Sequence, residues 1–281
     1  MLHIYLLCFS FLIIIKYSSH FLFPSFSPYF FRRISQYSEF FSVIVSSNKP
    51  ELWDSLCKTI FKENKIGTEI IFVGPKPPKH KLYKNCVYIK TSVKPSQCWE
   101  IASREAKGQY LLYSTDDIRL SKYFLTNSYR HIVKDNDNKI VYSCMFKKKK
   151  RSLLKGFNLV KNNKKTPLLG FISLFNSKIW KELGGLDSRF VALYSELDMT
   201  LRFHEIGGKT VFMKDCIATE IMFYPNHLTR MCSIDKRTLY SFWMKKKEFS
   251  NKRVFELLSF NNKKILKQSQ NRKKIGDRKW I

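Results

Sequence analysis

The sequence lacks paired cysteines, because none of its seven cysteines stands in a Cys-x-x-Cys spacing. That absence excludes a recognisable zinc knuckle or dithiol redox motif, since both need two thiols close together in the chain. Cysteines scattered singly are typical of free thiols in a reducing compartment. We therefore predict free thiols at Cys8, Cys57, Cys86, Cys98, Cys144, Cys216 and Cys232.

The sequence also lacks an apolar run long enough to cross a bilayer as a helix, which needs about 20 residues. The apolar run 2–15 is too short, and Pro24 and Pro28 interrupt any continuation towards Arg32. No basic residue precedes the run and no small-residue cleavage site follows it, so a signal peptide is a poor match. Residues 1–36 are therefore either a weak membrane anchor or the product of a mis-called start. The expected location is the cytoplasm or the cytoplasmic face of a membrane, with a single-pass anchor as the open alternative.

Acidic residues are scarce, since 51 Lys and Arg against 22 Asp and Glu give a formal net charge of +29. This excess indicates an anionic partner, which on composition alone is nucleic acid, a lipid surface or a phosphorylated substrate. Apolar residues interleave with lysines in the basic segment 236–281, a pattern that suits an amphipathic helix at an anionic membrane surface. The hydrophobic share of 44% is enough to bury a core, which excludes disorder of the whole chain.

Short buried strands alternate with amphipathic helices in the first half of the chain. Continuous apolar runs predict strands at 40–47, 69–73, 86–89 and 110–114, and helical spacing predicts helices at 51–64 and 96–107, the second capped by Gly108. This alternation predicts an α/β fold with a mostly parallel sheet covered by helices on both faces. Ligands bind such sheets beyond the carboxyl ends of the strands, where Ser46, Ser47, Asp116 and Asp117 fall.

The second half of the chain is less regular. The acid-free, lysine-rich stretch 147–165 predicts a loop, and order is expected again at 168–175. A helix is expected to open at Ser195 as its N-cap, with Glu196 and Asp198 in its first turn. Three parts are predicted: an apolar segment 1–36, an enzyme domain 37–230 and a basic helical extension 231–281.

Two groups of motifs stand in a recognisable order. In the first, a strand with a small-residue loop at 41–50 is followed by Lys107-Gly108-Gln109-Tyr110, and then by a strand that leads to the acidic pair. In the second, Gly184-Gly185-Leu186-Asp187-Ser188-Arg189-Phe190 precedes an acidic helix start. In this order the motifs resemble the family 2 inverting glycosyltransferases of the GT-A fold, over roughly residues 40–225. The resemblance implies a Rossmann-type sheet and sugar transfer from a nucleotide-activated donor.

Three positions depart from the family pattern. Gly74-Pro75 stands at the end of the second strand, where the family usually holds the base with an aspartate. Ser114-Thr115-Asp116 replaces Asp-x-Asp, which leaves Asp116 on the second acidic position with Asp117 beside it. Ser195-Glu196 replaces the catalytic Glu-Asp pair and places Glu196 where the family's base aspartate falls.

The resemblance implies a nucleotide-diphosphate sugar as donor and a divalent cation, Mn²⁺ or Mg²⁺, as cofactor. A cation held by one or two carboxylates and phosphate oxygens neutralises a leaving pyrophosphate. We expect Asp116, Asp117 and His227 at the metal, and Ser46, Ser47, Arg104 and Asp116 at the nucleotide sugar. The plainer alternatives are a turn at Asp116-Asp117, a solvated Arg104 and a surface His227.

Inversion at the anomeric carbon requires one general base that takes the proton of the acceptor hydroxyl. Glu196 is the expected base, with a first-turn acid that only complements the helix dipole as its alternative. Asp198 is predicted at the catalytic site, and it either supports that site or pairs with Arg202 one turn further on.

Three functions follow from these features. The first is an inverting glycosyltransferase acting on a glycan or lipid-linked acceptor. The second is a degenerate relative that binds without catalysis, suggested by Gly74 and Ser114. The third is a basic nucleic-acid-binding protein, which the absence of any nucleic-acid-binding motif disfavours. The sugar, nucleotide and acceptor depend on loop shapes that the sequence does not reveal.

Overall fold

The computed structural model describes residues 39–62, 66–149, 157–159, 172–221 and 227–243. They belong to one compact unit that begins at Ser38. The predicted segment 1–36 and the part of the basic extension beyond Trp243 lie outside the described residues. Within the described ranges, no helix is both long and apolar enough to cross a membrane.

The following cysteines are free, as predicted: Cys57, Cys86, Cys98, Cys144 and Cys216.

Four parallel strands form the first half of the sheet. They are β1 (Glu39–Ser46), β2 (Thr68–Gly74), β3 (Cys86–Lys90) and β4 (Gly108–Thr115), in the spatial order β3-β2-β1-β4. A 3₁₀ turn, η1 (Pro50–Leu52), and helix α3 (Trp53–Phe61) connect β1 to β2, and α4 (Pro95–Glu105) connects β3 to β4. The four predicted strands and the two predicted helices are confirmed, except that the helix predicted at 51–64 begins as a 3₁₀ turn and its α-helical part ends at Phe61.

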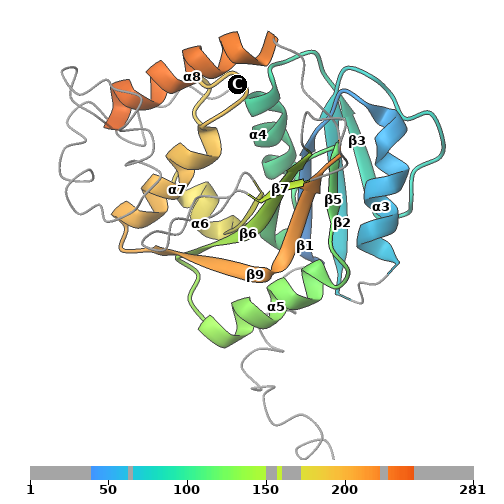
Figure 1. Cartoon of the computed structure of the whole chain (residues 1–281), viewed down its shortest axis with the longest axis horizontal. Coiled ribbons are helices and arrows are strands. Elements are labelled where there is room, and N and C mark those ends of the chain that lie inside the picture. The colour runs from blue at the N-terminus through green and yellow to red at the C-terminus, as the bar shows by residue number, and fades with distance from the viewer. Residues whose placement is uncertain (1–38, 63–65, 150–156, 160–171, 222–226, 244–281) are drawn as a thin grey trace, which may run out of the picture. The chain divides into compact units, whose positions relative to one another are not determined.

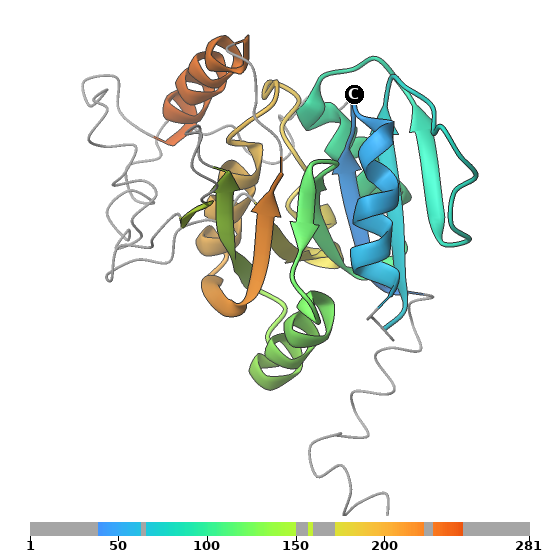
Figure 2. The ribbon, with the colours of Figure 1, turned by 45° about the vertical axis from the view of Figure 1, so that its right-hand side comes forward.

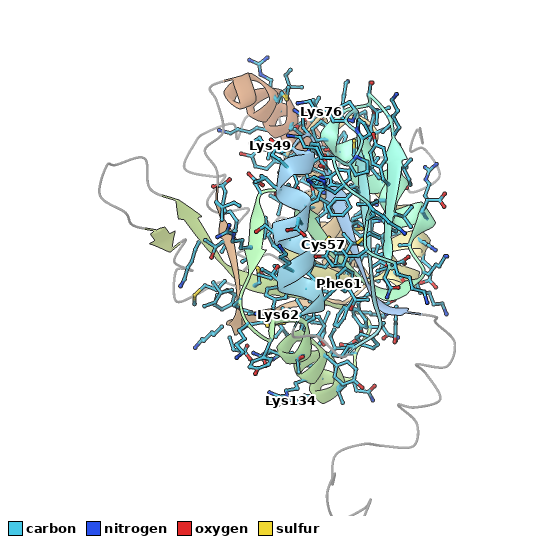
Figure 3. The ribbon with its side chains drawn as sticks, turned by 90° about the vertical axis from the view of Figure 1, so that its right-hand side faces the viewer. Lys49, Cys57, Phe61, Lys62, Lys76 and Lys134 are labelled. Carbon is cyan, nitrogen blue, oxygen red and sulfur yellow. The ribbon has the colours of Figure 1, made fainter. Side chains whose placement is uncertain are left out.

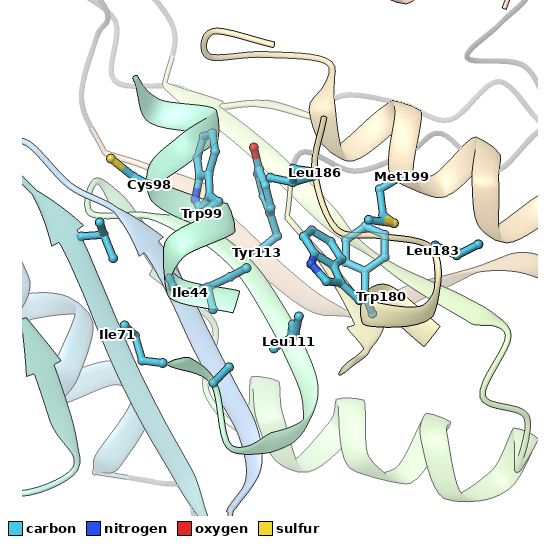
Figure 4. Packing of buried hydrophobic residues seen from close by; sticks show 14 of the residues in the cluster. Ile44, Ile71, Cys98, Trp99, Leu111, Tyr113, Trp180, Leu183, Leu186 and Met199 are labelled. Carbon is cyan, nitrogen blue, oxygen red and sulfur yellow. The ribbon is translucent and has the colours of Figure 1, made fainter. Parts of the chain in front are cut away.

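Two helices cover the two faces of these strands, α3 on one face and α4 on the other (Figures 1 and 2). Trp53 of α3 stacks on Phe72 of β2, with ring centroids 4.1 Å apart. On the other face, Trp99 of α4 stacks on Tyr113 of β4 within a hydrophobic cluster that includes Ile44 (Figure 4). Because both faces are covered, β2 and β4 are buried almost throughout, which explains their continuous apolar sequences.

The second half of the sheet is mixed. Its strands are β5 (Ile118–Leu120), β6 (Ile140–Lys149), β7 (Phe157–Leu159), β8 (Ser173–Asn176) and β9 (Lys209–Glu220), and its helices are α5 (Phe124–Asp135), α6 (Ser177–Glu182), α7 (Ser195–Glu205) and α8 (His227–Trp243). The order outward from β4 is β8-β6-β9-β5, with β6 and β9 parallel and the other neighbours antiparallel. Most paired residues of the whole sheet lie in parallel pairs, which confirms the predicted α/β class.

Two local expectations are wrong. The predicted loop 147–165 begins as strand, because Lys147–Lys149 at the end of β6 pair with β7. Gly108 does not cap α4, whose C-cap is Ala106, but begins β4. A Cβ added to Gly108 would lie 2.5 Å from the backbone nitrogen of Ser42, so this glycine permits a close approach of β4 to β1.

Helix α7 begins where predicted but is capped differently. The N-cap position is Tyr194, which has a left-handed backbone with φ of 64° and makes no side-chain cap hydrogen bond. The predicted cap, Ser195, is the first helical residue, and the Ser96 hydroxyl of α4 donates to its Oγ at 3.2 Å. Because Tyr194 takes the N-cap position, Ser195 becomes the first residue of the helix, where its hydroxyl contacts α4.

Candidate active site

The loop after β1 is fastened to Asp116 at the edge where the parallel strands end. The Oδ2 atom of Asp116 accepts hydrogen bonds from the Ser47 hydroxyl at 2.7 Å and from the backbone N–H groups of Asn48 at 2.8 Å and Lys49 at 2.7 Å. Ser46 is the last residue of β1. The structure therefore brings the predicted nucleotide-binding residues Ser46, Ser47 and Asp116 to one place.

The ionisation of Asp116 depends on two opposing influences. Burial raises its pKa, and the neighbouring Asp117 carboxylate raises it further. The three hydrogen bonds from the loop lower the pKa, because each stabilises the charged form. One oxygen of Asp116 is thus occupied by protein donors, and the loop fixes the direction of the carboxylate.

Asp117 is fully buried beside the end of β9. Its Oδ1 atom accepts a hydrogen bond from the Thr115 hydroxyl at 2.6 Å, while its Oδ2 atom has no hydrogen-bond partner among the described residues. The backbone carbonyl of Asp117 accepts from the N–H of Ile221 at 2.9 Å, directly after β9. The chain that leads to His227 therefore leaves β9 next to Asp117.

Two adjacent carboxylates, one of which has an oxygen without a partner among the described residues, fit a hard divalent cation. Mg²⁺ is commonly bound by one or two carboxylates that act together with substrate phosphates, so a larger protein cage is not required. The described part of the chain holds no group of three or more metal-ligating side chains. His227 begins α8, but its side chain lies outside the described part, so the metal assignment of Asp116, Asp117 and His227 stays a prediction.

Basic residues follow the carboxyl ends of β1 and β2. Lys49 comes shortly after β1 and Lys76 shortly after β2. Figure 3 shows these two lysines near one end of the molecule and Lys62 and Lys134 towards the other. The sheet edge that holds Asp116 thus also carries positive charge, which suits an anionic ligand.

Glu196 is buried in the first turn of α7, beside the last part of β4. The Tyr113 hydroxyl of β4 donates to its Oε2 atom at 3.5 Å and lies 3.4 Å from the Oγ of Ser195. Burial raises the pKa of Glu196 to about 7, and the negative charge of Asp235 adds to the rise. A carboxyl group with such a pKa can take up and release a proton near neutral pH.

Asp198 lies in a buried ion pair. Its Oδ2 atom is 2.9 Å from Nη2 of Arg202, and its Oδ1 atom accepts a hydrogen bond from Nε1 of Trp243 at 2.8 Å. Arg202 also donates to the backbone carbonyls of Leu183 at 2.7 Å and Gly185 at 2.6 Å. These contacts favour the alternative in which Asp198 pairs with Arg202. Arg202 in turn connects α7 to the turn at Gly184 and Gly185, the glycine turn.

The glycine turn also packs against α4. Gly185 has φ of 66°, and a Cβ added there would lie 2.4 Å from the carboxylate of Glu100. The same carboxylate accepts the backbone N–H of Leu186 at 2.8 Å, and a hydrogen bond from Nε of Arg104 at 2.9 Å. Near the C-terminal end of α4, Arg104 thus forms an ion pair with Glu100, the residue that contacts this turn.

Arg104 is not brought to the acidic pair. Trp99 lies more than one turn nearer the start of α4 than Arg104 does. Its Nε1 donates a hydrogen bond to the backbone carbonyl of Ser114, at the end of β4, at 2.6 Å. Lys107, just beyond the helix, donates its N–H to Glu69 at the start of β2. Arg104 therefore lies towards the edge where the parallel strands begin, opposite to the edge that carries Asp116.

The end of β2 leaves no space for the aspartate that the family usually places there. A Cβ added to Gly74 would lie 1.8 Å from the backbone carbonyl oxygen of Ser47. The Gly74 carbonyl accepts hydrogen bonds from the Tyr88 hydroxyl and from the N–H of Thr91, both at 3.0 Å. With this backbone, any side chain at position 74 would clash with the loop after β1.

Sequence reasoning did not single out Asp235 of α8. Its carboxylate is fully buried and accepts the backbone N–H groups of Val191 at 2.7 Å, Ala192 at 2.8 Å and Leu193 at 2.8 Å. These residues form the segment directly before α7. The available signal was a single acid in the otherwise acid-free stretch 221–247.

No protein-family model matches the sequence, and no curated protein sequence matches it. Solved structures match the fold. The crystal structure of GalNAc-T7 with UDP, GalNAc and Mn²⁺ matches with a TM-score of 0.56 at 15% identity, covering 75% of this chain and 49% of that one. This chain therefore spans about half the length of that relative.

Crystal structures of S. aureus TarS 1-349 match as well. The complex with UDP-GlcNAc has a TM-score of 0.53 at 13% identity and covers 78% of this chain and 70% of that one. The complex with UDP has a TM-score of 0.51 at 12% identity, with coverages of 78% and 69%. GalNAc-T7 and TarS are GT-A-type glycosyltransferases, and the likeness shows that this chain has a GT-A-like fold, as predicted.

Proposed function

We propose that the protein is an inverting glycosyltransferase that moves a sugar from a nucleotide-diphosphate sugar to a hydroxyl of a glycan or lipid-linked acceptor. The observation that carries the proposal is Glu196, a buried carboxyl group with a pKa raised to about 7. The Tyr113 hydroxyl of β4, the strand that leads directly to Asp116 and Asp117, donates a hydrogen bond to it. The UDP and UDP-GlcNAc bound to the structural neighbours support a nucleotide-sugar donor.

The donor is assigned to the edge formed by the loop after β1 and the acidic pair. Asp116 orders this loop, so the N-terminal end of η1 is fixed before the donor arrives. The lysines that follow β1 and β2 attract the diphosphate. A divalent cation at Asp116, Asp117 and His227 would supply charge neutralisation for the leaving nucleoside diphosphate.

Glu196 acts as the general base. Its ionised carboxylate takes the proton of the acceptor hydroxyl as that oxygen attacks the anomeric carbon from the side opposite the leaving group. The bond to the nucleoside diphosphate breaks with its electron pair, and the configuration is inverted. Asp198 acts as a positioning residue through Arg202 and the glycine turn.

An assay of nucleoside diphosphate release tests this proposal. With Mn²⁺ or Mg²⁺ and a panel of UDP- and GDP-sugars, the wild-type protein is expected to release the nucleoside diphosphate. Glu196→Gln should lower kcat by about 100-fold or more, because the amide cannot accept the proton. Glu182→Gln, an exposed acid of α6, is the matched control and should keep wild-type activity. Equal kcat values for the Glu196 variant and the wild type would refute the assignment of the base.

The lack of space for a side chain at Gly74, the last residue of β2, favours one second candidate. This is a glycosyltransferase-like protein that binds a nucleotide without transferring a sugar. Gly74 replaces the side chain that usually holds the base, and Ser114 replaces an acid. This candidate predicts metal-dependent binding of UDP or GDP in calorimetry, together with no release of nucleoside diphosphate from any sugar donor. Turnover by the wild-type protein would exclude it.

Contacts with an anionic membrane surface stay a prediction, because the basic extension beyond Trp243 lies outside the described residues. Vesicles with and without anionic lipid test it by cosedimentation at low and high salt. Binding only to the anionic vesicles, and loss of that binding at high salt, are the expected results.

A further inference from the structure

Helix α8 contacts the chain on both sides of Glu196. Before α7, Asp235 accepts the N–H groups of three consecutive residues, from Val191 to Leu193. Within α7, Trp243 donates to Asp198, two residues beyond Glu196. The segment that presents the proposed base is therefore held at two points by one helix.

We infer that Asp235 is a positioning residue that fixes the segment 191–196 and thereby sets the place of the base Glu196. The role of Asp235 in catalysis rests on the proposed function, but the contacts of Asp235 do not depend on that proposal. Consecutive backbone N–H groups that converge in a turn form a concavity for an anion, and here the anion is the Asp235 carboxylate. Three charge-assisted hydrogen bonds to one buried carboxylate make a strong and directional attachment.

A second set of contacts keeps α8 in place so that Asp235 can act. Phe242 packs edge-on against Phe190, with ring centroids 5.8 Å apart, and the guanidinium carbon of Arg189 lies 3.9 Å from the centroid of the Phe242 ring. Phe242 and Trp243 are both buried. Apolar contacts thus hold the C-terminal end of α8 in place. The hydrogen bonds of Asp235 then hold the segment before α7 against the same helix.

Asp235 also acts on Glu196 through its charge. Besides Asp235, Glu196 faces the Tyr113 hydroxyl of β4, and on its own helix Asp198 is paired with Arg202. The negative charge of Asp235 raises the pKa of Glu196, which adds to the larger effect of burial. Removal of this charge should therefore move the acid limb of the pH–rate profile to lower pH, an effect that a loss of overall stability alone would not produce.

Amide hydrogen exchange of the full-length chain tests the attachment without any substrate. Asp235→Ala should speed the exchange of the amides of 191–193 by about tenfold or more, because their acceptor is lost. Asp235→Asn keeps one accepting oxygen and should give a smaller increase. Thr238→Ala, which lies on the partly exposed side of α8, is the matched control and should leave these amides unchanged. Wild-type exchange at 191–193 in Asp235→Ala, with α8 still helical, would overturn the inference.

The pH–rate profile tests whether Asp235 affects catalysis through Glu196. For Asp235→Asn we expect a lower kcat with little change in the KM of the sugar nucleotide, and an acid limb displaced to lower pH. An unchanged kcat and an unchanged limb in a folded variant would overturn the positioning role. If the wild-type protein shows no transfer at all, the proposed function fails, whereas the exchange experiment still decides whether Asp235 holds the segment.

Discussion

At the scale of single residues, Glu196 is expected to make stability depend on pH. Its pKa is about 7 in the folded protein but about 4.3 in an unfolded chain. Between these values the folded state binds more protons, so the free energy of unfolding falls as the pH rises from about 4.3 to 7. The contribution lost is about 4 kcal/mol. Glu196→Gln should therefore be more stable than the wild type at pH 8 and similar to it at pH 5.

Urea unfolding at pH 5 and pH 8 measures this difference. Glu182→Gln serves again as the control, because its exposed side chain should leave the pH dependence unchanged. A pH dependence in Glu196→Gln equal to that of the wild type would show that Glu196 is not held in a desolvated environment. The same residue would then be a poor candidate for the base.

At the scale of elements, the end of β2 is fixed by a glycine that has no space for a side chain. Gly74→Ala should destabilise the protein by about 1–3 kcal/mol, as expected for overpacking, because its Cβ would meet the Ser47 carbonyl oxygen. The loop that Asp116 holds should also lose order. Thermal unfolding and the affinity for UDP in the presence of Mn²⁺ measure these two effects.

Gly207→Ala is the matched control for Gly74→Ala. Gly207 has φ of 82° but no atom within 4 Å of an added Cβ, so its substitution introduces backbone strain without a steric clash. We expect it to cost about 1 kcal/mol and to leave nucleotide affinity unchanged. If both variants lower stability equally and neither changes affinity, the contact between Gly74 and Ser47 does not shape the site.

At the scale of the whole molecule, the features that the sequence could predict are those with a local cause. Buried strands such as β2 produce continuous apolar runs, and Glu196 stands in a local motif. The attachment of Asp235 to residues 191–193 could not be predicted, because it joins positions more than forty apart in the chain and leaves no periodic pattern. The position of Arg104 could have been predicted from the expected parallel sheet, because a helix that connects two parallel strands runs antiparallel to them, and Arg104 lies at the end of α4 that leads into the start of β4.

Helix α8 crosses the predicted domain boundary at 230. Composition places a boundary at 230, but α8 runs from His227 to Trp243 and buries Leu239, Phe242 and Trp243. A chain that ends at 230 loses these contacts, at about 1.5–3 kcal/mol for each aliphatic or aromatic side chain. It also leaves three backbone N–H groups without the Asp235 carboxylate, at about 1–3 kcal/mol each.

These losses together approach the whole stability of a typical domain, about 5–15 kcal/mol. We therefore expect a chain that ends at Trp243 to unfold cooperatively on heating, and a chain that ends at 230 to unfold at a much lower temperature or without a cooperative transition. Circular dichroism of the two chains side by side measures the difference. Equal midpoints would show that α8 is not part of the folded unit and would support the boundary at 230.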